Sequence, residues 1–240
     1  MRRILRFLLV VPLFGIAFPA VAQVQRPQFR PAVLGTGPDS LVNRIDTKEL
    51  LQKGQKDGAV MFCAVVKADG QAGSAWTYRG MPNTDALNQE LTKRLEGVKF
   101  TPAIYNYQPV GVILYGTAIF SATGTPHLRI FLNQDSRELK EASDFIGPQP
   151  VFGGDSKFDG LTPPQGRNPV PLTAVVDLGL KINGEGQLLD MRLLAEEPPL
   201  LGYGQAALDD FREAKFIPAF RNGDRTECDI VLPVCYKPIE

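Results

Sequence analysis

Histidine is almost absent from this 240-residue sequence, which contains a single one, His127. A metal site built from several histidines is therefore excluded, and any histidine-based triad would depend on that one residue. His127 stands at the start of an expected strand, where a surface position is typical. The adjacent acids Glu196 and Glu197 usually point apart in a strand or loop, so a solvated turn is favoured over an acid/base pair. Gly184-x-Gly186 is too short for a dinucleotide-binding motif and lies in an expected hairpin. We expect no enzyme activity, no catalytic residue, no metal and no cofactor.

An excess of positive charge is also lacking, because 26 basic residues balance 26 acidic ones. Removal of residues 1–22 would take away three arginines and no acid, leaving a net charge near −3. Binding to phosphates requires a basic surface. We therefore expect no nucleic-acid partner.

Long apolar runs occur only at the N-terminus. Residues 1–22 begin with two arginines, continue as a mostly apolar run and end in the small-x-small pattern Ala20-Val21-Ala22. This layout is typical of a secretory signal peptide cleaved after Ala22, and predicts a periplasmic or secreted protein without stable membrane insertion. The alternative is an uncleaved anchor, but Arg6, Pro12 and Pro19 leave an apolar run shorter than the roughly 20 residues of a spanning helix.

Cysteine is sparse, and its three copies would enter an oxidising compartment after export. Cys228 and Cys235 share an expected strand but point to opposite faces, roughly 23 Å apart, so they cannot form a disulfide. Pairing of Cys63 with one of them across sheets stays open, although a buried or free thiol is favoured.

The most distinctive feature that is present is a repeated phrase, a motif of eight residues that occurs twice. Lys99-Phe-Thr-Pro-Ala-Ile-Tyr-Asn106 returns 116 residues later as Lys215-Phe-Ile-Pro-Ala-Phe-Arg-Asn222. Proline forces the preceding residue out of helical geometry, while the phenylalanine can stay anchored beneath the helix. We therefore interpret the phrase as a structural motif that ends a helix and directs the chain into a strand; its residues are Phe100, Pro102, Asn106, Phe216, Pro218 and Asn222.

Both copies of the phrase lie in the same order of expected elements. The first series has strands at 59–67 and 72–78, a helix at 83–96 and a final strand at 109–120. The second has strands at 172–182 and 188–194, a helix at 203–215 and a final strand at 226–236. An ungapped comparison of residues 58–120 with 174–236 yields ten identities, and the agreement in spacing is the stronger signal. The expected inward face of the first strand is formed by Val60, Phe62, Ala64 and Val66, and that of its counterpart by Val176, Leu178, Leu180 and Ile182. In the first strand Met61, Cys63 and Val65 make the second face apolar as well, which predicts that both faces are covered.

These patterns predict an α+β fold with two tandem strand-strand-helix-strand modules, each an antiparallel sheet backed by helices. The expected organisation is a signal peptide (1–22), an extended lead with a short helix capped by Asp39 or Ser40 (23–57), module 1 with an extra strand near His127 (58–134), a helix and Pro/Gly-rich linker (135–171), and module 2 (172–240).

The assembled residues resemble the C-terminal domain of TonB-type energy transducers. The resemblance rests on Ala206-Ala207-Leu208, the helix end Ala214-Lys-Phe-x-Pro-Ala219, Asn222-Gly223, and the strand end Val231-Leu-Pro-Val234. It is closer over residues 172–237, because in the first copy Glu90-Leu-Thr92 replaces the Ala-Ala-Leu element and Tyr107 replaces the glycine. A long proline-rich spacer is not present.

The resemblance implies that an edge strand pairs with an extended peptide, since an exposed edge presents unsatisfied backbone donors and acceptors. By resemblance the edge is the strand at 226–236, and the expected partner-binding residues are Cys228, Asp229, Val231, Pro233 and Cys235. The sequence thus predicts an exported, non-catalytic adaptor for envelope proteins or peptides, such as an outer-membrane receptor segment in a Gram-negative-type envelope. Alternatives are an anchored TonB-type transducer that serves outer-membrane receptor transport, and a hydrolase or inhibitor with a buried His127. Edge strands could also pair two chains into a homodimer.

Overall fold

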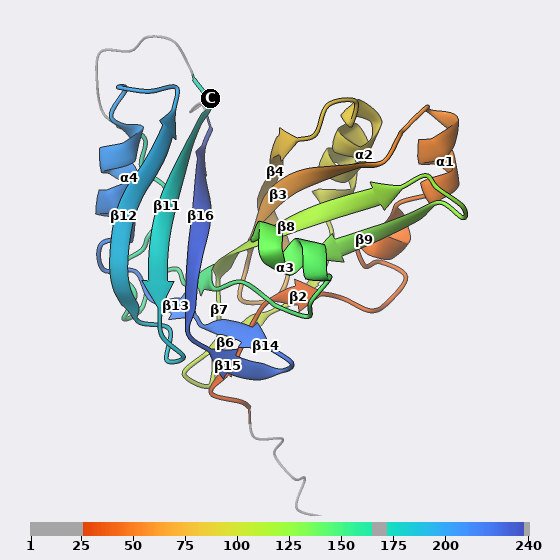
Figure 1. Cartoon of the computed structure of the whole chain (residues 1–240). Coiled ribbons are helices and arrows are strands. Elements are labelled where there is room, and N and C mark those ends of the chain that lie inside the picture. Colours follow the sequence, from red (N-terminus) through yellow and green to blue (C-terminus); the bar gives the residue numbers. More distant parts are fainter. Residues whose placement is uncertain (1–25, 165–171, 238–240) are drawn as a thin grey trace, which may run out of the picture.

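The structure is a computed structural model that describes residues 26–164 and 172–237. The chain has a mixed α+β fold of small antiparallel sheets and short helices, as predicted (Figure 1). The expected signal peptide, residues 1–22, lies outside the described residues. Within the described ranges, no helix has the length and apolar character needed to cross a membrane.

The elements of the described ranges fall into two larger sheets, four helices and several short ladders. The helices are α1 (Thr47–Gln52), α2 (Asp85–Leu95), α3 (Ser136–Glu141) and α4 (Tyr203–Phe211), preceded by a 3-10 turn, η1 (Val42–Arg44). The long strands are β3 (Gly58–Val66), β4 (Ala72–Gly80), β8 (Val112–Ser121), β9 (His127–Phe131), β11 (Ala174–Ile182), β12 (Leu188–Glu197) and β16 (Cys228–Tyr236). The short strands are β1 (Phe29–Arg30), β2 (Val33–Leu34), β5 (Phe100–Thr101), β6 (Ala103–Tyr105), β7 (Gln108–Val110), β10 (Gln149–Pro150), β13 (Phe216–Ile217), β14 (Ala219–Arg221) and β15 (Asp224–Thr226).

The first sheet has the strand order β4-β3-β8-β9, and all of its pairs are antiparallel. Helix α2 covers one face. Its buried leucines pack on the alternate residues of β3 that the sequence pattern assigned to the core. These residues are Leu87, Leu91 and Leu95 on the helix, and Val60, Phe62, Ala64 and Val66 on the strand.

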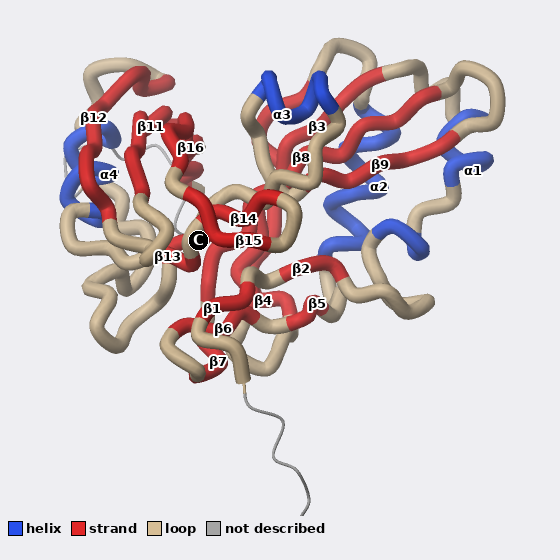
Figure 2. The backbone as a smooth tube through the Cα atoms, turned by 60° about the horizontal axis from the view of Figure 1, so that its bottom comes forward, coloured by secondary structure: helices blue, strands red, loops and turns tan. Residues whose placement is uncertain are grey.

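The second sheet has the order β12-β11-β16, with helix α4 on one face. The predicted inward residues of β11, Val176, Leu178, Leu180 and Ile182, are buried together with Ala207 and Phe211 of the helix. Strand β16 lies on the side of this sheet that faces the first sheet (Figures 1 and 2).

The second face of the first sheet is buried against the C-terminal half of the chain. Cys63, Ile113 and Tyr115 belong to the same apolar cluster as the core of the second sheet. The two halves are also joined by Arg79, which donates to both carboxylate oxygens of Asp177 at 2.9 and 3.1 Å. Coverage of β3 on both faces is thereby confirmed.

The repeated phrase does anchor its phenylalanines beneath the helices, since Phe100 and Phe216 are both buried. The route to the final strand differs from the prediction, because a small hairpin is inserted: β6–β7 in the first copy and β14–β15 in the second. The predicted strands at 109–120 and 226–236 are accordingly each divided, into β7 and β8 and into β15 and β16. The asparagine of each phrase occupies the hairpin turn with positive φ, 47° at Asn106 and 51° at Asn222.

Two other sequence-based predictions need correction. Helix α1 is capped by Asp46, whose side chain accepts from the N–H groups of Lys48 and Glu49, and not by Asp39 or Ser40. The described part of the expected linker is packed: Val151 donates to the Lys215 carbonyl at 2.9 Å, and Phe158 is fully buried in the second core. Prolines and glycines here shape a segment that runs between the halves and holds them together.

Candidate binding site at the edge of strand β16

Strand β16 is an unpaired sheet edge in the part of the chain that the structure describes. It pairs with β11 along its whole length, and no backbone hydrogen bond joins it to any other described segment. In the first sheet the corresponding strand, β8, is instead covered by β9. An uncovered edge presents a row of N–H and C=O groups to which an extended chain can add.

The position of Pro233 indicates which backbone groups point outward. Proline is tolerated within a strand where the missing N–H would face away from the ladder. Because successive residues of an antiparallel strand alternate in hydrogen-bonding direction, the N–H groups of Asp229 and Val231 share this outward direction. Val231 is 50% exposed and Asp229 is exposed, so their side chains are accessible as well.

The other expected partner-binding residues are placed differently. Pro233 and Cys235 are buried, and Cys235 lies beside Trp76 of the first half, so these two side chains cannot contact a partner directly. Cys228 turns its side chain to the opposite face, where it packs at the margin of the second core. The accessible part of the edge is therefore its first half, residues 228–231.

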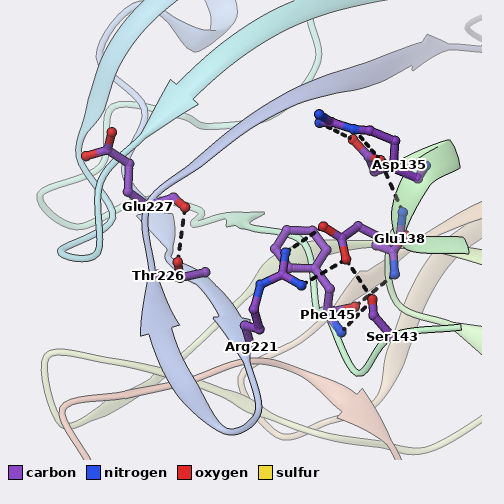
Figure 3. Close-up of polar contacts among 9 residues, drawn as sticks. Asp135, Glu138, Ser143, Phe145, Arg221, Thr226 and Glu227 are labelled. Atoms are coloured by element: carbon purple, nitrogen blue, oxygen red, sulfur yellow. Dashed lines mark hydrogen bonds and ion pairs between the residues drawn. The ribbon is translucent and has the colours of Figure 1, made fainter. Parts of the chain in front are cut away.

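A groove of about 430 Å³ runs between this accessible part and the segment that carries α3. One wall is formed by residues 227–230 and the other by α3, Phe145 and Arg221. Figure 3 shows Arg221 reaching from the β14–β15 hairpin across the ring of Phe145 toward Glu138. Arg221 donates to the two carboxylate oxygens of Glu138 at 3.0 and 2.5 Å, and its guanidinium lies 5.0 Å from the centre of the Phe145 ring.

The electrostatics of this wall follow from that ion pair. The Arg221 guanidinium, helped by the Ser143 hydroxyl, holds the pKa of Glu138 below its usual value despite partial burial. At the start of α3, Asp135 caps the helix by accepting from the N–H groups of Arg137 and Glu138. The wall is therefore a charged surface on which the Glu138 carboxylate is ionised at neutral pH.

Two further hollows meet the same stretch of β16. One, of about 180 Å³, lies on the open face of the second sheet, where its lining includes Gly179, Leu194 and Val231. The other, of about 20 Å³, lies between β16 and the segment around Asn133 and Gln134. Three hollows thus converge on Ile230 and its neighbours.

The other residues considered for catalysis or metal binding do not form a site. His127 is exposed and its Nδ1 lies 3.1 Å from the Thr125 carbonyl, so the hydrolase interpretation lacks the buried histidine that it required. Glu196 accepts from the N–H groups of Leu201 and Tyr203 at the start of α4. Among the described residues, no group of three metal-ligating side chains is close enough to hold an ion.

Sequence reasoning missed the opposite wall of the groove. Glu138 and Arg221 are 83 residues apart, and their meeting depends on tertiary packing that no local pattern reports. The only signal was Asp135, a helix-capping residue type at the start of the expected helix. Comparison with models of known protein families, with curated proteins and with solved structures finds no match for this chain.

Proposed function

We propose that this chain is an exported, non-catalytic adaptor that carries two TonB C-terminal-like modules and engages an envelope protein or peptide along the edge of β16. The free edge of β16, bordered by hollows on both sides of Ile230, is the observation that carries the proposal. Strand addition gives affinity through main-chain hydrogen bonds and specificity through alternate side chains.

A duplicated module is supported by the element boundaries. Strands β3 and β11 begin at Gly58 and Ala174, and β8 and β16 begin at Val112 and Cys228, each pair 116 residues apart. The short strands between them recur at the same interval: β5 with β13, β6 with β14 and β7 with β15. Isolated bridges recur too, from Gln71 to Lys99 and from Gln187 to Lys215.

The two modules differ in ways that favour the second as the binding one. In the first, β9 covers the edge of β8, and Tyr115 is only 6% exposed. In the second, Val231 occupies the position equivalent to Tyr115 and is 50% exposed. The first module thus serves as a support, and the second presents the site.

Affinity capture from an envelope extract tests this function with three forms of the protein. Val231→Pro removes an outward N–H without removing a bond to β11, whereas Val231→Thr keeps the N–H and a β-branched side chain. A partner retained by the wild type and by Val231→Thr, and lost with Val231→Pro, supports the proposal. If Val231→Pro retains every partner, binding along this edge is wrong.

A matched fold control accompanies the capture. The far-UV circular dichroism spectrum and the thermal midpoint of the Val231→Pro protein must remain close to those of the Val231→Thr protein. In addition, the mass of the mature N-terminus distinguishes the exported form, which starts at Gln23, from an anchored form that retains residues 1–22.

A further inference from the structure

The groove beside β16 carries negative charge that has no internal partner. Glu141 and Asp229 both line it, both are exposed, and neither has an ion-pair partner within 4 Å among the described residues. The two arginines of the groove are already engaged, Arg137 with Asp135 and Arg221 with Glu138. The charge left over in the groove is therefore negative.

A second, independent observation indicates that the site lacks a hydrogen-bond donor, which a partner could supply. Asn133 is only 3% exposed and lines the small hollow next to Ile230, Val231 and Leu232. Its amide nitrogen donates to the Phe145 carbonyl at 2.8 Å, but its Oδ1 has no hydrogen-bond partner within the described part of the chain.

Buried acceptors without a donor are rare because they cost free energy. The hollow of about 20 Å³ has the size of one ammonium group or one water molecule. A lysine side chain that reached it would supply the missing donor, and the fixed bond from Asn133 to Phe145 holds the acceptor in place for it.

Apolar contacts are also available at the site. Ile230 is partly exposed and lines all three hollows. Side chains of an added strand alternate between the two faces of the sheet. An occupant could therefore place basic residues on the face that carries Asp229, while its alternate, apolar residues lie on the other face beside Ile230.

We propose that the occupant is a cationic, strand-forming segment of another protein, in which lysine or arginine alternates with β-branched residues. This inference rests on the proposed function and adds to it the chemical class of the partner. The segment would be short, since only residues 228–231 of β16 are accessible and each strand residue spans roughly 3.3 Å.

Binding measured by isothermal titration calorimetry to three synthetic octapeptides tests the inference. Valine alternates with lysine in the first, with threonine in the second and with glutamate in the third. At low salt we expect the lysine peptide to bind about tenfold or more tightly than the glutamate peptide, with the threonine peptide between them. Raising the salt to roughly 0.5 M should narrow that difference, because exposed charges are screened.

Variants of the two unpaired acids, Glu141 and Asp229, test the charge preference most directly in the same binding measurement. The double variant Glu141→Gln with Asp229→Asn should lower the ratio of lysine-peptide to threonine-peptide affinity by about fivefold or more. Glu96→Gln, an exposed acid at the end of α2 outside the groove, should leave that ratio unchanged.

The outcomes separate this inference from the function on which it rests. If all three peptides bind equally and Val231→Pro abolishes binding of each, the edge is a binding site and the charge preference is wrong. If no peptide binds, or if Val231→Pro has no effect, the edge-pairing function fails and the cationic preference fails with it.

Discussion

The carbonyl oxygen of Phe216 lies where a side chain on Gly186 would have to be: a Cβ added to Gly186 would sit 1.9 Å from it. The Phe216 N–H donates to the Gly186 carbonyl at 2.9 Å, so this glycine joins the β11–β12 turn to the repeated phrase. The same relationship holds in the first half, where Phe100 donates to Gly70 at 2.8 Å. The phrase is thus held by the turn as well as by the helix that it ends.

Substitution of Gly186 by alanine should destabilise the protein by about 2 kcal/mol or more, because it combines a backbone clash with a φ of +74°. Chemical denaturation measures the change in the free energy of unfolding. Gly184→Ala is the matched control, since it lies in the same turn, has open space around it and should be nearly neutral. Equal effects of the two substitutions would show that the contact with Phe216 does not matter.

Tyr107 presents the opposite case, an L-residue in a turn that favours glycine. Asn106 and Tyr107 have φ values of 47° and 65°, whereas the equivalent turn in the second half is Asn222-Gly223. Tyr107 is half exposed, so little packing is lost on its removal. We expect Tyr107→Gly to raise the free energy of unfolding by about 0.5 kcal/mol, as relief from the left-handed conformation outweighs the added entropy of the unfolded chain. A decrease would contradict this account of the turn.

The ion pair between Arg221 and Glu138 should make stability depend on pH in a defined direction. Because the folded-state pKa of Glu138 is lowered, the pair stabilises the fold above the unfolded-state pKa, about 4.3, and loses this effect as the pH falls through the folded value. A double-mutant cycle of Arg221→Gln and Glu138→Gln should give a favourable coupling at pH 7 and none near pH 2. A coupling that is unchanged at pH 2 would exclude the ion pair as its source.

The three cysteines are free thiols in this structure and should be unreactive in the native state. Burial raises the pKa of Cys63 and Cys235, and raises that of Cys228 to about 12, so thiolate is scarce at pH 8. Iodoacetamide followed by mass spectrometry should show almost no labelling of the folded protein and three adducts in denaturant. A single adduct in denaturant would instead show that two cysteines had formed a disulfide.

Alternating apolar residues were sufficient to predict both larger sheets, because each has one face on a helix and the pattern reports that burial directly. The start of α1 was missed because Asp39, Ser40 and Asp46 are all good capping residues and the sequence cannot rank them. The hairpin at Asn106 was missed because Pro109 read as the beginning of a longer strand.

The candidate site could be predicted only in part. Alternation placed Asp229 and Val231 on one face of the last strand, but burial of Pro233 and Cys235 depends on how the two halves pack. The wall built from α3 and Arg221 is a product of the same packing. Long-range contacts of this kind leave no periodic trace in the sequence.

Amide hydrogen exchange at Val231, measured by NMR with and without the alternating lysine–valine peptide, tests the central claim most directly. In the free protein the Val231 N–H should exchange much faster than that of Leu232, whose N–H points to β11. On saturation with the peptide, exchange at Val231 should slow by about tenfold or more, while exchange at Leu193 on the other edge of the sheet stays unchanged. Protection of Val231 in the free protein, or no change at Val231 when the peptide is bound, would contradict strand addition at this edge.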